Sequence, residues 1–382
     1  MLMQRNIAHL DLDTFFVSVE RLMNSRLKNL PVIVGGGSDR GVVSACSYEA
    51  RQYAVHSGMP IKMAKQLCPD AIIIRGDMDT YTRYSRMVTD IVAEKAPVYE
   101  KASIDEHYLD LTGFDKFFGS LKWVHELRNT IMKETGLPVS MGLSVNKTVA
   151  KIATGESKPC GEMHVQAPMI ASFLDPLPIQ KIPMLGKQSC RMLRSMGVAH
   201  IRTLKMIPPE MMEKVLGKNG RSIWEKAHGI DYSPVVQYCE RKSISHEHTF
   251  ERDTTDVACI RTLLSASVEK LCFKLRNDEW LCSCVTVKIR YSDFNTHTLQ
   301  QRIAYTSFDH TLIETALALF DRLYSRRMLI RLVGIKLSGL VRGTQQLDLF
   351  DDTPELVQLY MAMDTIRKRF GVSALKRAGG ML

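Results

Sequence analysis

The chain has 382 residues, of which 45% are hydrophobic and 24% charged, and this balance is typical of a globular protein. Its length predicts roughly two to four domains. No apolar run approaches the roughly 18 residues of a membrane span, which excludes a membrane-spanning protein. The formal net charge of +10 at pH 7 favours a polyanionic partner.

Cysteine usage predicts a reducing compartment. The nine cysteines include no Cys-x-x-Cys pair, so we expect reduced, mostly buried thiols. The first residues, from Met1 to Asn6, lack the shape of a signal peptide. We therefore expect a cytoplasmic protein that contacts no membrane.

Residues 7–13 form the first predicted strand, because polar and apolar side chains alternate strictly along them. One face carries Ala8, Leu10 and Leu12, and the other carries His9, Asp11 and Asp13. A helix is predicted from about Thr14 to Asn24. We expect Asp13 to cap the N-terminus of this helix rather than to bind a metal.

A small inserted αβ unit follows the first helix. Its predicted strands lie at 31–34 and 41–45, and Tyr48 to Arg51 open a helix. Pro60 suits the first turn of another helix. A longer helix is predicted from Met78 to Glu94.

Asp105 and Glu106 form an adjacent acidic pair near the bend of a predicted β-hairpin, whose strands are residues 97–102 and 107–111. Adjacent carboxylates repel each other, and a hard cation such as Mg²⁺, which prefers carboxylate oxygen, removes that repulsion. If the first strand lies beside the hairpin, Asp11 can complete a two-metal site. The alternative is a surface acidic pair at a turn.

The elements between residues 4 and about 166 follow the order βαββαβ once the inserted unit is left out. This is the ferredoxin-like plan, in which the first strand lies beside the strands of the central hairpin. The last strand is predicted at 138–144, and a helix begins at Asn146. Lys147, Lys151 and Lys158 are candidate phosphate contacts, with a solvated basic helix end as the alternative.

Residues 167–238 have the pattern of short helices and turns. Within them, residues 182–187 and the following helix resemble a helix-hairpin-helix, a motif that holds phosphate beside a helix N-terminus. Gly186 and Lys187 would then contact DNA. Met184 stands where a glycine is usual, which puts close backbone approach in doubt.

A second αβ module is predicted from Lys242 to Arg342. Its strands lie at 285–291 and 332–337, and its helices run from about 257 to 277 and from 311 to 324. Lys288 and Arg290 share one strand face, which suits a sheet laid along a phosphate backbone. A solvated sheet face is the alternative.

The last segment combines a short apolar peptide with a helix. Residues 346–350 have three large apolar side chains beside Asp351 and Asp352, which is typical of a docking peptide. A helix is predicted from Thr353 onward. Its expected apolar face consists of Leu356, Tyr360, Met363, Ile366 and Phe370.

Several of these segments resemble the signature segments of the Y-family translesion DNA polymerases, in the same order and at matching spacing. They are His9–Glu20, Ser47–Arg51, Ser103–Glu106, Gly142–Lys151, Lys158-Pro159 and Lys242–Phe250. The resemblance covers about residues 4 to 342 and is strongest to the DNA polymerase IV branch of that family. Gln346–Phe350 resembles the pentapeptide that binds the bacterial sliding clamp.

The resemblance implies an α+β fold shaped as a right hand, with a ferredoxin-like palm, small fingers, a helical helix-hairpin-helix thumb and an αβ little-finger domain. The implied boundaries are 1–22 and 76–166 for the palm, 23–75 for the fingers, 167–238 for the thumb, 239–241 for a linker, 242–342 for the little finger and 343–382 for a clamp-binding tail with a C-terminal helix.

The resemblance also implies a template-directed, error-prone polymerase for translesion synthesis, which adds dNTPs to a primer 3′-OH with two Mg²⁺ ions. The implied metal ligands are Asp11, Asp105, Glu106 and the backbone carbonyl of Leu12. The implied dNTP-binding residues are Phe15, Phe16, Tyr48, Arg51 and Lys158. Phe16 would be the steric gate against a ribose 2′-hydroxyl, and core packing is its alternative role.

The expected partners are primer-template DNA, dNTPs and the β subunit sliding clamp, and the enzyme is expected to be a monomer. The expected DNA contacts are Lys147, Lys151, Gly186, Lys187, Lys288, Arg290 and Arg331. The expected clamp contacts are Gln346, Leu347, Leu349 and Phe350.

Three positions depart from the family pattern. Ala45 stands where Thr is frequent, Gly155 where Asp is common, and Met184 where the hairpin usually has Gly. None of them is a predicted metal ligand. The alternative functions are a non-catalytic DNA- and clamp-binding scaffold and a nucleotidyl cyclase. The complete set of metal and phosphate ligands opposes the scaffold, and the inserted fingers, the thumb hairpin and the clamp peptide oppose the cyclase.

Overall fold

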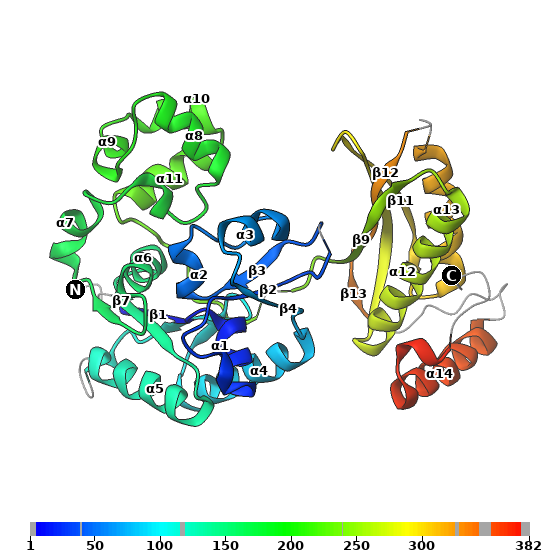
Figure 1. Ribbon diagram of the computed structural model, residues 1–382, viewed down its shortest axis with the longest axis horizontal. Coiled ribbons are helices and arrows are strands. Elements are labelled where there is room, and N and C mark those ends of the chain that lie inside the picture. The colour runs from blue at the N-terminus through cyan, green and yellow to red at the C-terminus, as the bar shows by residue number, and fades with distance from the viewer. Residues whose placement is uncertain are drawn as a thin grey trace. The chain divides into compact units, whose positions relative to one another are not determined.

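The computed structural model describes residues 5–38, 40–114, 119–238, 240–324, 328–343 and 353–375. The chain divides into two compact units, Met1–Cys239 and Glu240–Leu382 (Figure 1). No helix within the described ranges has both the length and the apolar character that crossing a bilayer requires.

The first unit is built on a five-stranded sheet. Its strands, in spatial order, are β5 (Tyr99–Lys101), β6 (Glu106–Asp110), β1 (Ile7–Leu12), β7 (Val139–Ser144) and β8 (Glu162–His164). β5 and β6 form an antiparallel hairpin, and β1 pairs antiparallel with both β6 and β7. The predicted hairpin and its place beside the first strand are therefore confirmed.

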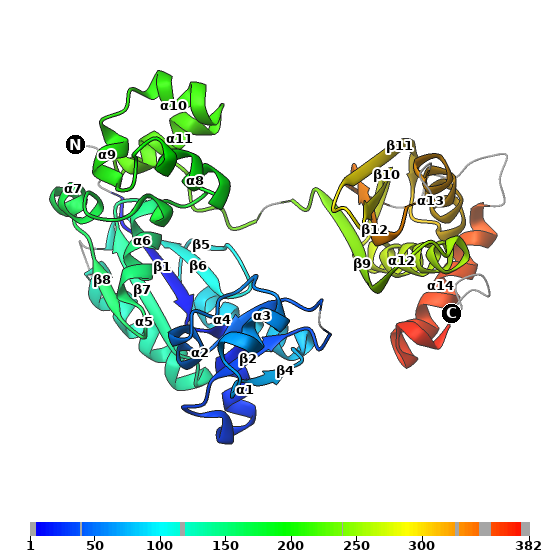
Figure 2. The same cartoon turned by 45° about the horizontal axis from the view of Figure 1, so that its top comes forward.

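The alternation along β1 separates a core face from a polar face. Ala8, Leu10 and Leu12 are buried in one apolar core. That core also takes side chains from α1 (Phe15–Met23), α4 (Met78–Lys95) and α5 (Ser120–Thr135). The opposite face of the sheet is covered by α6 (Lys147–Ser157), which lies across β1 and β7 (Figure 2).

Gly142 on β7 allows α6 to approach the sheet this closely. A Cβ atom at this position would lie 2.2 Å from the backbone oxygen of Ala150 and 2.6 Å from the backbone nitrogen of Thr154. The N-terminus of α6 is fixed by Asn146, whose side chain accepts a hydrogen bond from the Val149 N–H. Asp231 accepts two further hydrogen bonds, from the backbone N–H and the hydroxyl of Thr148.

Two smaller groups of elements in the first unit have cores of their own. One is the sheet β3 (Val43–Cys46), β2 (Val32–Gly35) and β4 (Ile72–Ile74), with helices α2 (Tyr48–Gln52) and α3 (Ile61–Leu67). The other comprises α7 (Ile170–Leu174), α8 (Lys187–Ser195), α9 (Ile201–Lys205), α10 (Pro209–Leu216) and α11 (Asn219–Ala227).

The second unit is a five-stranded antiparallel sheet with two helices on one face (Figure 2). The strands, in spatial order, are β11 (Thr296–Thr306), β10 (Trp280–Tyr291), β12 (Ile330–Ser338) and β9 (Ser243–Thr254), and β13 (Val341–Arg342) pairs with the start of β10. The helices are α12 (Val257–Asn277) and α13 (Asp309–Leu323).

The C-terminal helix α14 (Thr353–Phe370) packs differently from the prediction. Of its expected apolar face only Tyr360 is buried, whereas Ile366 is 40% and Phe370 65% exposed. The buried side carries Tyr360, Asp364 and Arg367. Distant charged partners cause this difference, because Asp364 pairs with Arg276 and Arg367 pairs with Glu269.

Candidate active site

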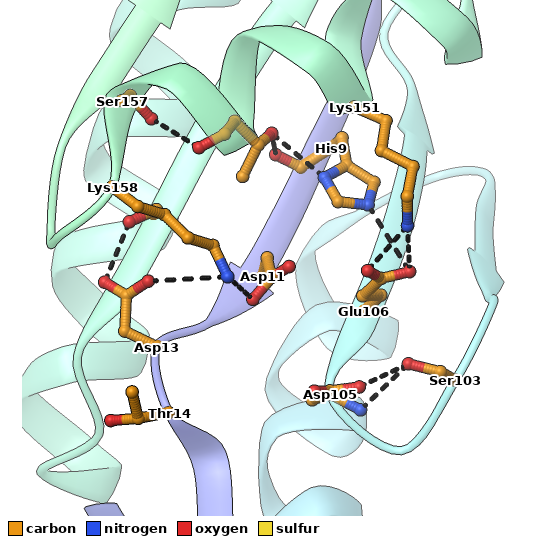
Figure 3. Close-up of polar contacts among 12 residues, drawn as sticks. His9, Asp11, Asp13, Thr14, Ser103, Asp105, Glu106, Lys151, Ser157 and Lys158 are labelled. Carbon is orange, nitrogen blue, oxygen red and sulfur yellow. Dashed lines mark hydrogen bonds and ion pairs between the residues drawn. The ribbon is translucent and has the colours of Figure 1, made fainter. Parts of the chain in front are cut away.

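The three carboxylates predicted to bind metal come from adjacent backbone positions. Asp11 on β1 lies directly opposite Glu106 on β6 in the strand register. The N–H of the next residue, Leu12, donates to the backbone oxygen of Asp105 at 3.0 Å. The strand pairing therefore brings together an early aspartate and an acidic pair almost a hundred residues later (Figure 3).

Each of these carboxylates has its own hydrogen-bonding partner. The Lys158 ammonium forms an ion pair with Asp11, and the Lys151 Nζ lies 2.6 Å from Glu106 Oε1. The Ser103 hydroxyl donates to Asp105 Oδ1 at 2.5 Å. Within the described ranges, no three His, Cys, Asp or Glu side chains are close enough to hold a metal ion in this arrangement.

Burial and the nearby positive charges act in opposite directions on the pKa values of this acidic cluster. Burial raises the pKa of Asp11 to about 6; the charges of Glu106 and Asp105 add to the increase, and Lys158 opposes it. Burial also disfavours ionised Glu106, but nearby His9 and the Lys151 ammonium lower its pKa to about 2. Neighbouring, partly buried carboxylates of this kind are a donor set that fits hard divalent cations.

His9, on the same face of β1 as Asp11, lies between α6 and Glu106. Its ring is buried, and burial lowers its pKa, which favours the neutral imidazole. Nδ1 lies 2.9 Å from the Thr154 hydroxyl on α6, and Nε2 lies 3.8 Å from Glu106 Oε2. His9 thus links α6 to the carboxylate that Lys151 contacts.

Asp13 does not cap α1, so that prediction was wrong. The N-cap is Thr14, which has a left-handed backbone (φ 43°), and no side chain caps the helix. The Asp13 side chain remains with the sheet, where it is only 1% exposed. Its Oδ2 accepts hydrogen bonds from the Ser140 hydroxyl at 2.8 Å and the Cys160 N–H at 2.6 Å.

Asp13 is also where two of the predicted phosphate-binding residues meet. Its Oδ1 lies 3.4 Å from the Tyr48 hydroxyl and 3.7 Å from the Lys158 ammonium. The Arg51 guanidinium lies 5.0 Å from the centre of the Tyr48 ring. Tyr48 and Arg51 therefore lie close to Lys158, which comes from a distant segment. Asp13, which was predicted to cap a helix, contacts both Tyr48 and Lys158.

The two phenylalanines at the start of α1 have different surroundings. Phe15 is 3% exposed and belongs to the core, so its side chain is not available to a ligand. Phe16 is partly buried and stacks on Tyr81, with ring centres 4.3 Å apart and ring planes 14° from parallel. The Tyr81 hydroxyl in turn donates to Glu20. This stacking fixes the orientation of the Phe16 ring.

Three of the lysines predicted to bind DNA already have acidic partners. Lys147 Nζ lies 2.7 Å from Glu100, and Lys288 Nζ lies 2.8 Å from Glu247. Lys151 contacts Glu106, as described above. Arg290 donates to the Thr296 hydroxyl, and Arg331 lies over the Phe294 ring.

The region predicted as a hairpin ends at Gly186, which is the N-cap residue of α8, and Lys187 is the first residue of that helix. Met184 has a left-handed backbone (φ 74°), the conformation that a glycine adopts readily, and its side chain is 86% exposed. The turn therefore forms without the usual glycine.

Two basic residues on the second sheet were not predicted from the sequence. Lys336 pairs with Thr286, and Arg302 pairs with Cys284. Both therefore share the sheet face of Lys288 and Arg290, and both are exposed. Alternation along β12 could have identified Lys336, but β11, which carries Arg302, was not predicted as a strand. The predicted clamp peptide, residues 346–350, lies outside the described residues.

Comparison with known proteins gives consistent matches. Residues 10–155 match the impB/mucB/samB family, and residues 241–349 match its C-terminal domain. A DNA polymerase IV of Dehalococcoides mccartyi (strain CBDB1) is 38% identical over 97% of this chain and 96% of its own length. Two solved structures are each 26% identical to this chain and cover 88% of it and 100% of their own chains. One is a Y-family DNA polymerase chimera, Dbh-Dpo4(243-245)-Dbh, with a TM-score of 0.78. The other is an insertion ternary complex of Dbh DNA polymerase, with a TM-score of 0.63.

Proposed function

This chain belongs to the impB/mucB/samB family and is a Y-family, DNA-directed DNA polymerase, and we propose that it copies damaged templates by two-metal nucleotidyl transfer. The observation that carries the proposal is the pairing of Asp11 with Glu106, beside Asp105 and next to Tyr48 and Lys158, which both contact Asp13. This arrangement joins a carboxylate cluster to a cationic phosphate site.

Two Mg²⁺ ions would be held by Asp11, Asp105, Glu106 and the backbone carbonyl of Leu12. The support is chemical, because these groups are hard oxygen donors, and the neighbouring carboxylates attract cations already. When bound, Mg²⁺ would lower the pKa of the primer 3′-hydroxyl and neutralise charge on the triphosphate.

The side chains around this cluster would bind and select the nucleotide. Tyr48, Arg51 and Lys158 would hold the β- and γ-phosphates, Arg51 through its forked donors and Lys158 as a point charge. Burial and the Asp13 carboxylate raise the pKa of Tyr48, which keeps its hydroxyl protonated as a donor. The Phe16 ring would occupy the space that a ribose 2′-hydroxyl needs.

The four largest apolar clusters of the described residues support the assignment of palm, fingers, thumb and little finger. We propose that the palm carries the carboxylates, the fingers carry Tyr48 and Arg51, and the thumb and little finger hold the primer-template duplex. The duplex contacts would include Gly186, Lys187, Lys288 and Arg290. A sliding clamp would bind residues 346–350, and the enzyme would act as a monomer.

The central test is primer extension with Mg²⁺ on intact and lesion-bearing templates. Asp105→Ala or Glu106→Ala should reduce nucleotide addition on the order of 10³-fold or more, because a metal site contributes several kcal/mol to transition-state stabilisation. Duplex binding and melting temperature should change little, since removing one carboxylate relieves repulsion.

Asp110→Ala is the matched control. Asp110 is at the end of the same strand as Glu106, and its carboxylate contacts Thr112 rather than the site. The control should extend primers as the wild type does, and chelation of Mg²⁺ should stop both. Near wild-type extension by Asp105→Ala and by Glu106→Ala would contradict the metal assignment.

A further inference from the structure

Asp13 is a buried carboxylate whose two oxygens have different surroundings. Oδ2 accepts hydrogen bonds from the Ser140 hydroxyl on β7 and the Cys160 N–H, at 2.8 Å and 2.6 Å. The Ser140 donor belongs to the framework of the first unit, because Ser140 is fully buried and lies opposite Asp11 in the β1–β7 register. These two bonds fix the orientation of the whole carboxylate.

The other oxygen points toward the phosphate-binding side chains. Oδ1 lies 3.4 Å from the Tyr48 hydroxyl and 3.7 Å from the Lys158 ammonium (Figure 3 shows the Asp13 contact with Lys158). Tyr48 belongs to α2, whereas Lys158 follows the end of α6. A single charged oxygen therefore lies between two donors that come from segments more than a hundred residues apart.

Asp13 also holds the backbone that carries Lys158. The Cys160 N–H that donates to Oδ2 is only two residues beyond Lys158. The lysine is thus restrained at its backbone by one carboxylate oxygen and near its ammonium by the other. Lys158 contacts Asp11 as well, so Asp13 supplies the contact that does not depend on a predicted metal ligand.

We propose that Asp13 is a positioning residue that holds Tyr48 and Lys158 in the geometry that binds the triphosphate. Because Asp13 is 1% exposed, it does not touch the nucleotide and acts through these two side chains. The inference rests on the proposed function of Tyr48 and Lys158 as phosphate ligands. It assigns to Asp13 a role that neither helix capping nor metal binding provides.

A purely structural role makes a different prediction. If Asp13 served only to connect β1, β7 and the Cys160 segment, its replacement would lower stability and reduce every activity in parallel. A positioning role instead predicts a selective loss in the binding of the incoming nucleotide. The two roles therefore differ in how the loss divides between KM for dNTP, kcat and duplex affinity.

Asp13→Asn is the main variant, because it keeps the shape of the side chain and removes its charge. We expect KM for dNTP to rise on the order of 10- to 100-fold, as for a lost hydrogen bond to a charged group. Duplex affinity should stay within about twofold of wild type, a free-energy change well below 1 kcal/mol. The melting temperature shows that the variant is folded.

Asp110→Asn is the matched control, since its carboxylate also accepts a backbone N–H and a hydroxyl, both from Thr112. It should leave KM for dNTP unchanged. Ser140→Ala is a milder variant that removes one anchor of Oδ2 and should raise KM for dNTP by a smaller factor. Ser140→Ala also keeps the test valid if Asp13→Asn folds poorly.

A double-mutant cycle identifies the route of the effect. In a Tyr48→Phe, Lys158→Ala background, Asp13→Asn should have little further effect on KM for dNTP, because both side chains that it positions are already altered. An equal, additive increase in that background would overturn the inference.

The outcomes also separate this inference from the proposed function. If the wild type fails to extend a primer with Mg²⁺, the proposed function itself is wrong. If the wild type extends primers and Asp13→Asn and Ser140→Ala keep the wild-type KM for dNTP, the proposed function stands and the positioning role is overturned. A parallel loss of duplex binding and stability without a selective KM change would also overturn it.

Discussion

Three residues of β1 and its end, His9, Asp11 and Asp13, lie on the face of the sheet opposite the apolar core. Alternation explains this shared face, but the partners of the three side chains differ. His9 contacts Thr154, Asp11 pairs with Lys158, and Asp13 joins Ser140 to Tyr48. Because those partners come from other elements, one strand face organises contacts from much of the first unit.

Phe16 provides a test at the scale of a single side chain. If it is the steric gate, Phe16→Ala should raise incorporation of ribonucleotides relative to deoxyribonucleotides. The loss of stability should be smaller than the roughly 3–5 kcal/mol of a fully buried phenylalanine, because Phe16 is only partly buried. Sugar selectivity and the melting temperature should both be measured.

Phe15→Ala is the comparison for Phe16, since Phe15 is 3% exposed and belongs to the core. It should cost more stability and change the sugar preference less. Unchanged sugar selectivity in Phe16→Ala together with a large loss of stability would assign Phe16 to the core instead.

At the scale of elements, α14 is attached to the second unit through charged groups as well as through the buried Tyr360 ring. Arg276 donates two hydrogen bonds to Asp364, at 2.7 Å and 3.0 Å, and another to Asp309 at 2.6 Å. Arg367 contacts Glu269 at 3.2 Å. A buried ion pair requires accurate geometry to offset its desolvation cost, so it fixes the orientation of the helix.

Asp364→Ala should therefore release α14 without unfolding the sheet. Removing one partner of a buried ion pair costs about 3–5 kcal/mol of stability. The apolar side chains on the exposed side of this helix bury too little surface to compensate for that loss. Amide hydrogen exchange in residues 353–370 should speed up strongly, while β10 and β12 remain protected. Gln358→Ala, at an exposed position of the same helix, is the control, and unchanged exchange in Asp364→Ala would refute this account of the attachment.

The same elements show what could be predicted from the sequence. Local periodicity identified β1, the β5–β6 hairpin and α12. The predicted end residues match the structure for α12, whereas the predicted ends of β1 and of the hairpin strands differ from it by one or more residues. β11 was missed because most of its residues are exposed on both faces and alternate weakly. The buried side of α14 was predicted wrongly because Arg276 lies 88 positions before its partner Asp364, a separation that periodicity does not detect.

The site itself was predicted to different degrees. The proximity of Asp11 to Glu106 followed from the ferredoxin-like topology, before any contact was known. Asp13 was wrongly predicted to cap α1. Thr14, which has a left-handed backbone, separates Asp13 from this helix, and no sequence pattern indicates that conformation. The lysine partners of the carboxylates were also missed, since they depend on how α6 lies on the sheet.

At the scale of the whole molecule, we predict that residues 346–350 bind the sliding clamp. Leu349→Ala together with Phe350→Ala should abolish stimulation by the clamp and leave extension without the clamp unchanged. A short peptide with few apolar anchors gives an affinity on the order of micromolar, or about −8 kcal/mol, which suits a transient polymerase. Tethering raises the local enzyme concentration at the primer without changing the chemistry.

The control for the clamp test is Leu359→Ala with Met361→Ala, which changes two exposed apolar residues of α14. This variant should be stimulated by the clamp as strongly as the wild type. Full stimulation of the Leu349→Ala, Phe350→Ala variant would show that the peptide does not mediate docking.

The close contact at Gly142 makes the active site vulnerable to substitutions that touch none of its residues. A side chain there would push α6 outward until the 2.2 Å contact reached an ordinary 3.4 Å or more, and would carry Lys151 and Lys158 away from Glu106 and Asp11. Gly142→Ala should therefore lose primer extension, whereas Gly155→Ala, with nothing within 4 Å of its Cβ position, should retain it. A screen of random inactive variants should therefore find substitutions in the packing between β7 and α6 as well as substitutions of the active-site residues.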